Sequence, residues 1–447
     1  MNTNFEYIVE SAWLAEHLDE PNVVVLDTTT HLLPRQDKPY DIVSGRSDFE
    51  AAHIPGAQFV DLDMELSDPN QPAHLRFMLP SMQVFAQVMS RLGITNQTHV
   101  VCYATANHWW ATRMWWMLRV FGHDKASVLN GGFQKWSREG RAIAVGQSKP
   151  RAASSFEPAF RAELVANKAD VFAAIDDQGI CTINALRPEQ HRGEPGGSNY
   201  GRPGHIAGSV NIAAIHIVDE NNVFKPLHEL RTMFAQALAS DRVITYCGGG
   251  IAASSDALIL TILGHPDVRI YDASLSEWAR DKSLPMEKGD RIMTIAIDDP
   301  AKPDVYALLQ EHLKSMFALS PPESVHALDV SALKQDGISF WTIRDGSQLL
   351  GCGALKTLSA EHGEIKSMRT ATNYRRRGAG RALLLHIIHE AKSSGFIRLS
   401  LETGTAQSFI PAQRLYASAG FLACGPFGDY KVDPHSLFMT LDLSLYS

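Results

Sequence analysis

The chain has 447 residues, and at roughly 150 residues per domain this length predicts about three domains. Hydrophobic residues make up 45% of the sequence and charged residues 20%, a globular composition that excludes a fibrous or largely disordered chain. There are 41 Lys and Arg against 49 Asp and Glu, so the formal net charge of −8 argues against nucleic acid or an anionic membrane as a principal partner.

The cysteines and the N-terminus indicate the compartment. An odd and sparse set of cysteines argues against a disulfide framework and favours a reducing compartment: Cys102, Cys181, Cys247, Cys352 and Cys424. The N-terminus lacks a basic region followed by an apolar run, and no apolar stretch approaches the roughly 18 residues needed to span a bilayer. We therefore expect a soluble, cytoplasmic protein.

Short strands and longer helices alternate through the first two thirds of the chain. The runs 23–27 and 243–246 are rich in β-branched residues and predict buried strands, and Ser254 to Leu263 has a helical pattern. This alternation predicts an α/β fold with a parallel sheet covered by helices on both faces. Ligands of such sheets lie beyond the carboxyl ends of the strands.

Three landmarks of this region occur twice, in the same order. The second copies follow the first by 142 to 152 residues and indicate a duplicated domain: 53–57 matches 205–209, 100–103 matches 243–246, and 128–136 matches 270–278. The last third shares none of them. The polar segments 147–155 and 281–289 have the composition of connections between domains. We expect domains at 1–147, 156–285 and 288–447.

The last third has a different pattern. Consecutive apolar strands are predicted at 338–343, 349–355 and 364–370, and they precede a helix that opens near Gly378. This order predicts an α+β sheet with a turn between strand and helix of the kind that binds phosphate.

Cys247 ends a predicted buried strand and precedes Gly248, Gly249, Gly250, Ile251, Ala252 and the helix. Consecutive glycines let the backbone curl so that its N–H groups face inward, and the helix N-terminus adds positive potential, so the loop would stabilise a thiolate or a persulfide. One alternative is an ordinary core cysteine, which the glycine run disfavours. The other is a cysteine phosphatase, which needs an arginine about where Ala253 stands.

With these landmarks, residues 1 to about 285 resemble the tandem-domain rhodaneses, which are sulfurtransferases. The resemblance implies two rhodanese-like parallel-sheet domains, the first a degenerate copy, because Ala104 aligns with Cys247. It also implies that Cys247 takes sulfane sulfur from thiosulfate or 3-mercaptopyruvate and passes it to a thiol or cyanide. The donor-binding arginine of the family falls on Arg187, with Arg192 as a weaker candidate, although Asn184 stands where the family commonly has aspartate. The alternative is a sulfur-carrier or sensing module without turnover.

The basic turn before the last predicted helix carries a second signature. A nuclear-localisation run is disfavoured because three arginines hardly make one, and a dinucleotide fingerprint fails because Leu383 replaces its third glycine. Together with the segment 415–421, Leu-Tyr-x3-Gly-Phe, the turn makes residues 288–447 resemble the GNAT N-acetyltransferases. The resemblance implies acetyl-CoA as co-substrate, an unknown amine as acceptor, and no metal.

The same resemblance assigns the residues of this second site. Tyr416 is the candidate acid that protonates the CoA thiolate, and Glu364 is a candidate base, for which a surface salt bridge is an equal alternative. The acetyl-CoA site is expected at the end of the preceding strand, the basic turn and the helix start: Met368, Thr370, Arg375, Arg376, Arg377, Gly378, Ala379, Gly380 and Arg381.

Overall fold

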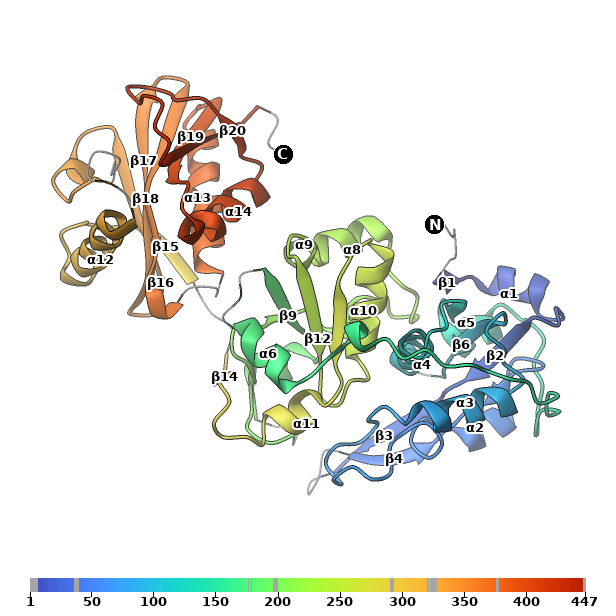
Figure 1. Ribbon diagram of the computed structural model, residues 1–447. Helices are drawn as coiled ribbons and strands as arrows, with labels where there is room; N and C mark the ends of the chain where they lie inside the picture. The colour runs from blue at the N-terminus through green and yellow to red at the C-terminus, as the bar shows by residue number, and fades with distance from the viewer. Residues whose placement is uncertain are drawn as a thin grey trace. The chain divides into compact units, whose positions relative to one another are not determined.

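The computed structural model describes residues 7–35, 40–105, 107–175, 177, 179–195, 200–289, 293–319, 321, 328–374 and 378–444 (Figure 1). Contacts divide the chain into two compact units, Met1–Gly289 and Asp290–Ser447, and each has its own buried core. Within the described ranges, no helix is both long and apolar enough to cross a membrane.

The first repeat is a five-stranded parallel sheet in the order β1-β7-β6-β2-β5. Its strands are β1 (Ile8–Val9), β2 (Val23–Asp27), β5 (Gln58–Phe59), β6 (His99–Tyr103) and β7 (Ala126–Leu129). An antiparallel hairpin, β3 (Thr30–Pro34) with β4 (Tyr40–Ser44), follows β2. The helices are α1 (Ser11–His17), α2 (Arg46–Ala51), α3 (Met82–Arg91), α4 (His108–Val120) and α5 (Gly132–Arg138).

The second repeat has the same sheet in the same order. Its parallel strands run β11-β9-β12-β13-β8, namely β8 (Val165–Ala166), β9 (Ile180–Asn184), β11 (Val210–Asn211), β12 (Arg242–Tyr246) and β13 (Val268–Tyr271). The short strands β10 (His205–Ile206) and β14 (Met286–Glu287) pair separately. The helices are α6 (Lys168–Ile175), α7 (Pro188–Arg192), α8 (Leu227–Met233), α9 (Ala235–Leu238), α10 (Ala253–Ile262) and α11 (Ser274–Trp278).

The two repeats meet through equivalent helices related by an approximate two-fold axis. Thr112 of α4 and Ser255 of α10 occupy corresponding positions, and their hydroxyls lie 2.9 Å apart. The ends of the repeats also exchange matching bonds: Phe224 N–H donates to Asn130 Oδ1 over 2.9 Å, and Leu79 N–H donates to Asp272 Oδ2 over 3.0 Å. Because α4 and α10 are buried along most of their length, the repeats share one core cluster.

The second unit is a seven-stranded sheet in the order β15-β16-β17-β18-β19-β21-β20. Its strands are β15 (Met293–Ile297), β16 (Ile338–Asp345), β17 (Gln348–Ser359), β18 (His362–Thr370), β19 (Arg398–Gly404), β20 (Leu422–Cys424) and β21 (Ser436–Asp442). Helix α12 (Pro303–Leu319) covers one face, and α13 (Ala379–Ser393) covers the other together with α14 (Ile410–Ser418) (Figure 1). The apolar stripe of α13 is buried against the sheet: Leu383, Leu384, Ile387, Ile388 and Ala391.

Strands β18 and β19 separate towards their carboxyl ends. They pair in parallel only from His362 to Ile365 with Arg398 to Leu401, although β18 continues to Thr370 and β19 to Gly404. The other neighbouring strands of this sheet pair antiparallel. The divergence leaves the last part of β18 with an open edge, where backbone groups can pair with an extended ligand.

Candidate active sites

The Cys247 loop follows β12 and is shaped by Gly250. Strand β12 is buried because its β-branched and aromatic side chains lie in the middle of the parallel sheet, which places Cys247 at its carboxyl end. Gly250 has φ +75°, and a Cβ there would lie 2.6 Å from Asp272 Oδ1, so the position requires glycine. At Gly249 the nearest atom to an added Cβ, Arg76 O, is 3.7 Å away.

Ser274 holds the loop from the start of α11. Its hydroxyl accepts from the N–H of Cys247 over 3.0 Å and from the N–H of Gly250 over 3.1 Å, and it donates to Tyr271 O. Ser274 itself has φ +51°, whereas the corresponding residue of the first repeat is Gly132 with φ +55°. A serine in this left-handed region is strained, so its hydroxyl bonds offset a backbone cost.

The remaining amides of the loop are uncommitted. The N–H groups of Gly248, Gly249, Ile251 and Ala252 donate to no backbone or side-chain acceptor among the described residues. They border the first turn of α10, which is ten residues long and begins at Ala253. Such a set of amides can solvate an anionic sulfur at Cys247 because each N–H directs a partial positive charge outward.

The sequence led us to expect Cys247 in an open loop, but in the structure Cys247 is enclosed. Its exposed fraction is only 3%, and the ring of Tyr200 lies so close to Gly248 that an added Cβ would be 2.0 Å from it. Tyr40 of the first repeat stands beside Tyr200, with ring centroids 6.5 Å apart. Tyr200 therefore stands against the Cys247 loop, with Tyr40 beside it.

The two phenols are neutral at physiological pH. Burial raises the pKa of Tyr40 to about 12, and the nearby charge of Cys247 adds to the rise while Arg76 opposes it. Burial likewise raises the pKa of Tyr200 well above its usual value, with further contributions from Tyr40 and Cys247. Neither hydroxyl has a hydrogen-bond partner within the described part of the chain, so both are free to donate to a sulfur anion.

The two arginines predicted to bind the sulfur donor, Arg187 and Arg192, have different surroundings. Strands β9 and β12 are neighbours, with Asn184 opposite Tyr246, so the loop after β9 lies at the same sheet edge as Cys247. Arg187 precedes α7 with an exposed guanidinium that bonds to none of the described residues. Arg192 ends α7 and its Nε lies 2.5 Å from Glu194 Oε1. Asn184 contacts neither arginine; it accepts from Leu186 N–H and donates to the His191 ring.

The first repeat contributes residues that sequence reasoning missed. Arg113 of α4 is 1% exposed, and its Nη1 lies 2.6 Å from Asp272 Oδ1 and 3.3 Å from Gly250 O. Its other Nη donates to Phe77 O. Tyr40, Arg76 and Arg113 lie more than a hundred residues before the loop, and no spacing pattern connects them to it.

The second site lies where β18 leaves β19. Gly378, with φ +79°, is the N-cap of α13, and the first amides of the helix, those of Ala379, Gly380 and Arg381, have no intrahelical acceptor. A Cβ at Gly380 would lie 3.1 Å from Thr370 Oγ1, so glycine allows close approach of helix and strand. These features suit the pyrophosphate of acetyl-CoA. The Met368 side chain packs against the core instead. Arg375, Arg376 and Arg377 lie outside the described residues.

Tyr416 and Glu364 occupy different environments. Burial holds the pKa of Tyr416 far above its usual value, and its hydroxyl bonds to none of the described residues. Glu364 is 2% exposed; its Oε1 accepts from Tyr430 over 2.6 Å and lies 3.3 Å from Lys366 Nζ. The candidate base is therefore part of a buried polar network rather than a surface salt bridge.

The comparisons with known proteins cover both parts of the chain. The rhodanese-like domain model matches residues 10–139 and 173–281, and the acetyltransferase (GNAT) family model matches residues 305–421. Over 285 residues the chain is 33% identical to the 3-mercaptopyruvate sulfurtransferase of Escherichia coli, covering 63% of this chain and 98% of that protein. Over 151 residues it is 52% identical to the uncharacterized N-acetyltransferase YsnE of Bacillus subtilis, covering 34% of this chain and all of that protein.

A solved structure agrees. The crystal structure of the Escherichia coli 3-mercaptopyruvate sulfurtransferase SseA aligns with a TM-score of 0.53 and 32% identity, over 60% of this chain and 98% of that one. The chain belongs to the rhodanese-like family and carries a C-terminal GNAT domain. It is an enzyme with a sulfurtransferase part and an N-acetyltransferase part, which confirms the predicted fold classes and functions.

Proposed function

We propose that Cys247 is the nucleophile of the sulfurtransferase part and that 3-mercaptopyruvate is its preferred donor. The observation that carries the proposal is the set of uncommitted amides around Cys247 at the start of α10. Support for the donor comes from the relative of that name and from the loop, which has no cationic side chain between Gly248 and Ala252. Arg187, and more weakly Arg192, would hold the donor carboxylate.

The reaction is a double displacement. The Cys247 thiolate attacks the mercaptopyruvate sulfur, the carbon–sulfur bond breaks, and the carbon takes its electron pair and a proton to leave as pyruvate. The persulfide keeps a negative charge that the loop amides and the Tyr40 and Tyr200 hydroxyls can solvate. An acceptor thiolate or cyanide then attacks the outer sulfur, and the electron pair of the sulfur–sulfur bond returns to Cys247.

The test is a donor panel read by intact-protein mass spectrometry. The full chain is incubated with 3-mercaptopyruvate or thiosulfate, and we expect a gain of one sulfur that is absent in Cys247→Ser. Cys102→Ser is the matched control and should load normally, because Cys102 is fully buried in the first repeat. Faster loading by thiosulfate would overturn the donor preference; loading of Cys247→Ser, or no loading by either donor, would overturn the nucleophile.

Turnover separates an enzyme from a sulfur carrier. We expect repeated thiocyanate formation from cyanide and mercaptopyruvate, with many equivalents of product per chain. A single equivalent that stops once the persulfide is discharged would instead favour the carrier module. The unpaired state of all five cysteines supports the cytoplasm as the location, because a reducing compartment keeps thiols free.

For the second part we propose that acetyl-CoA binds along the open edge of β18 with its pyrophosphate on the first amides of α13. Acetyl-CoA supplies the activated thioester when bound. In this proposal Tyr416 is the acid for the departing thiolate and Glu364 is the base, and the hydrogen bond from the Tyr430 hydroxyl to Glu364 supports a proton path through Tyr430. The acceptor is an amine that the resemblance to the GNAT family does not identify.

Titration calorimetry of the full chain with acetyl-CoA tests this site. Gly378→Glu should abolish binding, because it puts a carboxylate at the pyrophosphate position. Gly346→Glu is a matched control: it also replaces a left-handed glycine, φ +55°, but with nothing within 4 Å of the added Cβ. Equal binding by both variants, or no binding by the unaltered chain, would remove the assignment.

A further inference from the structure

The turn at residues 76–79 of the first repeat is fastened to the residues that support the sulfur-binding loop of the second. Arg113, which pairs with Asp272, donates from its second Nη to Phe77 O. Leu79 N–H donates to Asp272 Oδ2 over 3.0 Å. Phe77 is buried and has a left-handed φ of +61°, which a bulky residue keeps only where surrounding contacts fix it. The turn therefore has a fixed place beside the loop.

Arg76 of this turn lies next to the loop glycines. Its main-chain O is 3.7 Å from the position of a Cβ added at Gly249. Its guanidinium acts on Tyr40: burial raises the pKa of Tyr40 to about 12, the charge of Cys247 adds to the rise, and Arg76 opposes it. Because one phenol responds to both charges, the guanidinium and the Cys247 sulfur lie near the same hydroxyl. An anion that reaches the sulfur therefore comes within electrostatic range of Arg76.

The Arg76 side chain is available to a ligand. It is exposed, and its guanidinium forms neither a hydrogen bond nor an ion pair with any residue that the structure describes. Asp63 is an acidic group whose charge Arg76 offsets: burial raises the pKa of Asp63, Arg76 lowers it and Asp61 raises it. Arg76 therefore counters a carboxylate that would otherwise repel an anionic donor.

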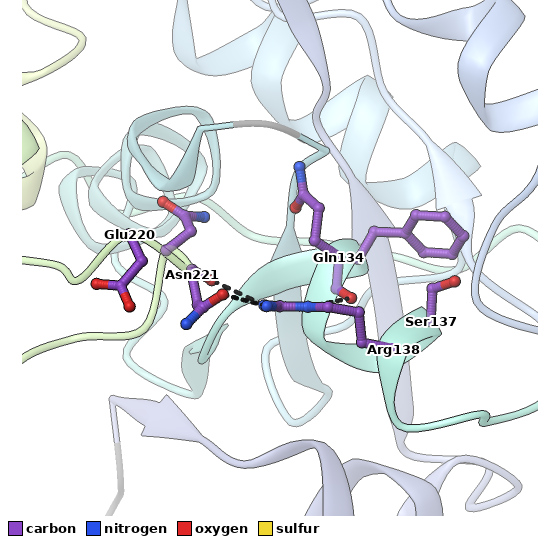
Figure 2. A pocket seen from close by; sticks show the side chains of 7 residues that line it. Gln134, Ser137, Arg138, Glu220 and Asn221 are labelled. Carbon is purple, nitrogen blue, oxygen red and sulfur yellow. Dashed lines mark hydrogen bonds between the residues drawn. The ribbon is translucent and has the colours of Figure 1, made fainter.

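The equivalent position of the second repeat is engaged. Arg76 and Asn221 correspond, since each immediately precedes a residue in the left-handed conformation, with φ of +61° and +62°. The side-chain and main-chain oxygens of Asn221 accept from Arg138 (Figure 2). The counterpart of Arg138 is Arg280, a cation that offers Arg76 no acceptor. Arg76 therefore keeps its N–H donors for a ligand.

We propose that Arg76 is a specificity-determining residue of the sulfurtransferase site, which binds the carboxylate of 3-mercaptopyruvate while the thiol of the donor lies at Cys247. The inference rests on the proposed function, and it adds a cation of the first repeat to Arg187 of the second. A guanidinium holds a carboxylate with two parallel hydrogen bonds. It therefore favours a donor that has a carboxylate over an uncharged thiol of similar size.

The experiment measures the rate of sulfur loading on the full chain over a range of 3-mercaptopyruvate concentrations. Arg76→Gln should raise the half-saturating concentration at least ten-fold and change the maximal rate less than three-fold, because the lost contact forms before the carbon–sulfur bond breaks. Arg76→Lys keeps the charge and should recover part of the loss. An unchanged half-saturating concentration in Arg76→Gln would overturn the proposal.

A donor without the carboxylate separates binding from a structural effect. 1-Mercaptopropan-2-one has the thiol and ketone of mercaptopyruvate but no charge, so its rate of loading should differ less than three-fold between Arg76→Gln and the unaltered chain. An equal loss with both donors would refute the assignment, since it would mean that Arg76 only supports the fold of the loop.

Arg138→Gln is the matched control. It removes the same charge from an exposed arginine of the same repeat, at a cleft that Cys247 does not line (Figure 2). Its half-saturating concentration should stay within two-fold of the unaltered value, and a ten-fold rise would show that net charge, not Arg76, attracts the donor. Absence of sulfur loading in the unaltered chain would instead overturn the proposed function, so the two failures are distinguishable.

Discussion

Arg113 and Asp272 form a buried ion pair that ties the first repeat to the Cys247 loop of the second. The two side chains are 1% and 5% exposed and 2.6 Å apart, and Arg113 also reaches Gly250 O. Asp272 in turn accepts from Leu79 N–H. The first repeat, in which Ala104 aligns with Cys247, therefore supplies the cation that supports the loop of the second.

Replacing one partner of this ion pair should destabilise the fold more, per substitution, than replacing both partners together. We expect Arg113→Met and Asp272→Asn each to lower the free energy of unfolding by about 3–5 kcal/mol, because each leaves a buried charge without its partner. The double variant should lose less than the sum of the two. Tryptophan fluorescence during thermal unfolding measures this, since seven of the eight tryptophans precede residue 290. Additive losses would contradict a direct interaction.

Replacing Ser274 should affect the rate of persulfide formation more than the stability of the fold. Ser274→Gly removes a left-handed strain of about 1–2 kcal/mol together with two hydrogen bonds of about 1 kcal/mol each, so stability should change little. The rate of persulfide formation should fall, because the N–H groups of Cys247 and Gly250 lose their acceptor. The rate is measured by incubating the protein with 3-mercaptopyruvate, quenching samples at set times and reading the gain of sulfur by mass spectrometry. A variant that loads as fast as the unaltered chain would show that the hydroxyl has no part in shaping the loop.

Gly249 and Gly250 should differ in how well they tolerate substitution by alanine. Gly250→Ala forces a Cβ to 2.6 Å from Asp272 Oδ1 at a φ of +75°, so we expect at least a hundred-fold slower sulfur loading. Gly249→Ala meets nothing closer than 3.7 Å and keeps its amide, so loading should change less than three-fold. Equal rates in the two variants would mean that the loop is shaped by something other than this contact.

Buried histidines should make the first unit sensitive to acid. Burial lowers the pKa of His108 to about 4, and burial with the neighbouring His205 lowers that of His191 to about 3. Below the unfolded value of about 6.5, the unfolded chain binds protons that the folded chain does not, so stability present above pH 6.5 is lost as pH falls. Each histidine contributes up to about 1.4 kcal/mol per pH unit.

The measurement is the thermal midpoint of the tryptophan transition at pH 7, 6 and 5. The midpoint of the unaltered chain should fall with pH, and that of His191→Gln should fall less steeply. Parallel curves for the two proteins would show that His191 titrates alike in the folded and unfolded chain.

Much of the site was accessible from sequence because its parts are adjacent in the chain. The strand, Cys247, the three glycines and the helix start form one continuous segment, and so do the end of β18, the basic turn and α13. Local hydrophobic patterns and glycine spacing specify such segments. Glu364 was ambiguous from sequence, since a partner 66 residues away, Tyr430, decides whether it is buried or exposed.

The sequence alone determined the duplicated α/β architecture, the GNAT unit, the nucleophile candidate and the two anion-binding turns, because each depends on short-range spacing. Only the tertiary structure decided how enclosed Cys247 is and which hydroxyls and cations lie near it. Those features arise where α4 packs on α10, bringing together residues such as Tyr40 and Tyr200 that are 160 positions apart. The physical reason is that burial and charge pairing depend on packing between repeats, and packing at that range leaves no periodic signal in the chain.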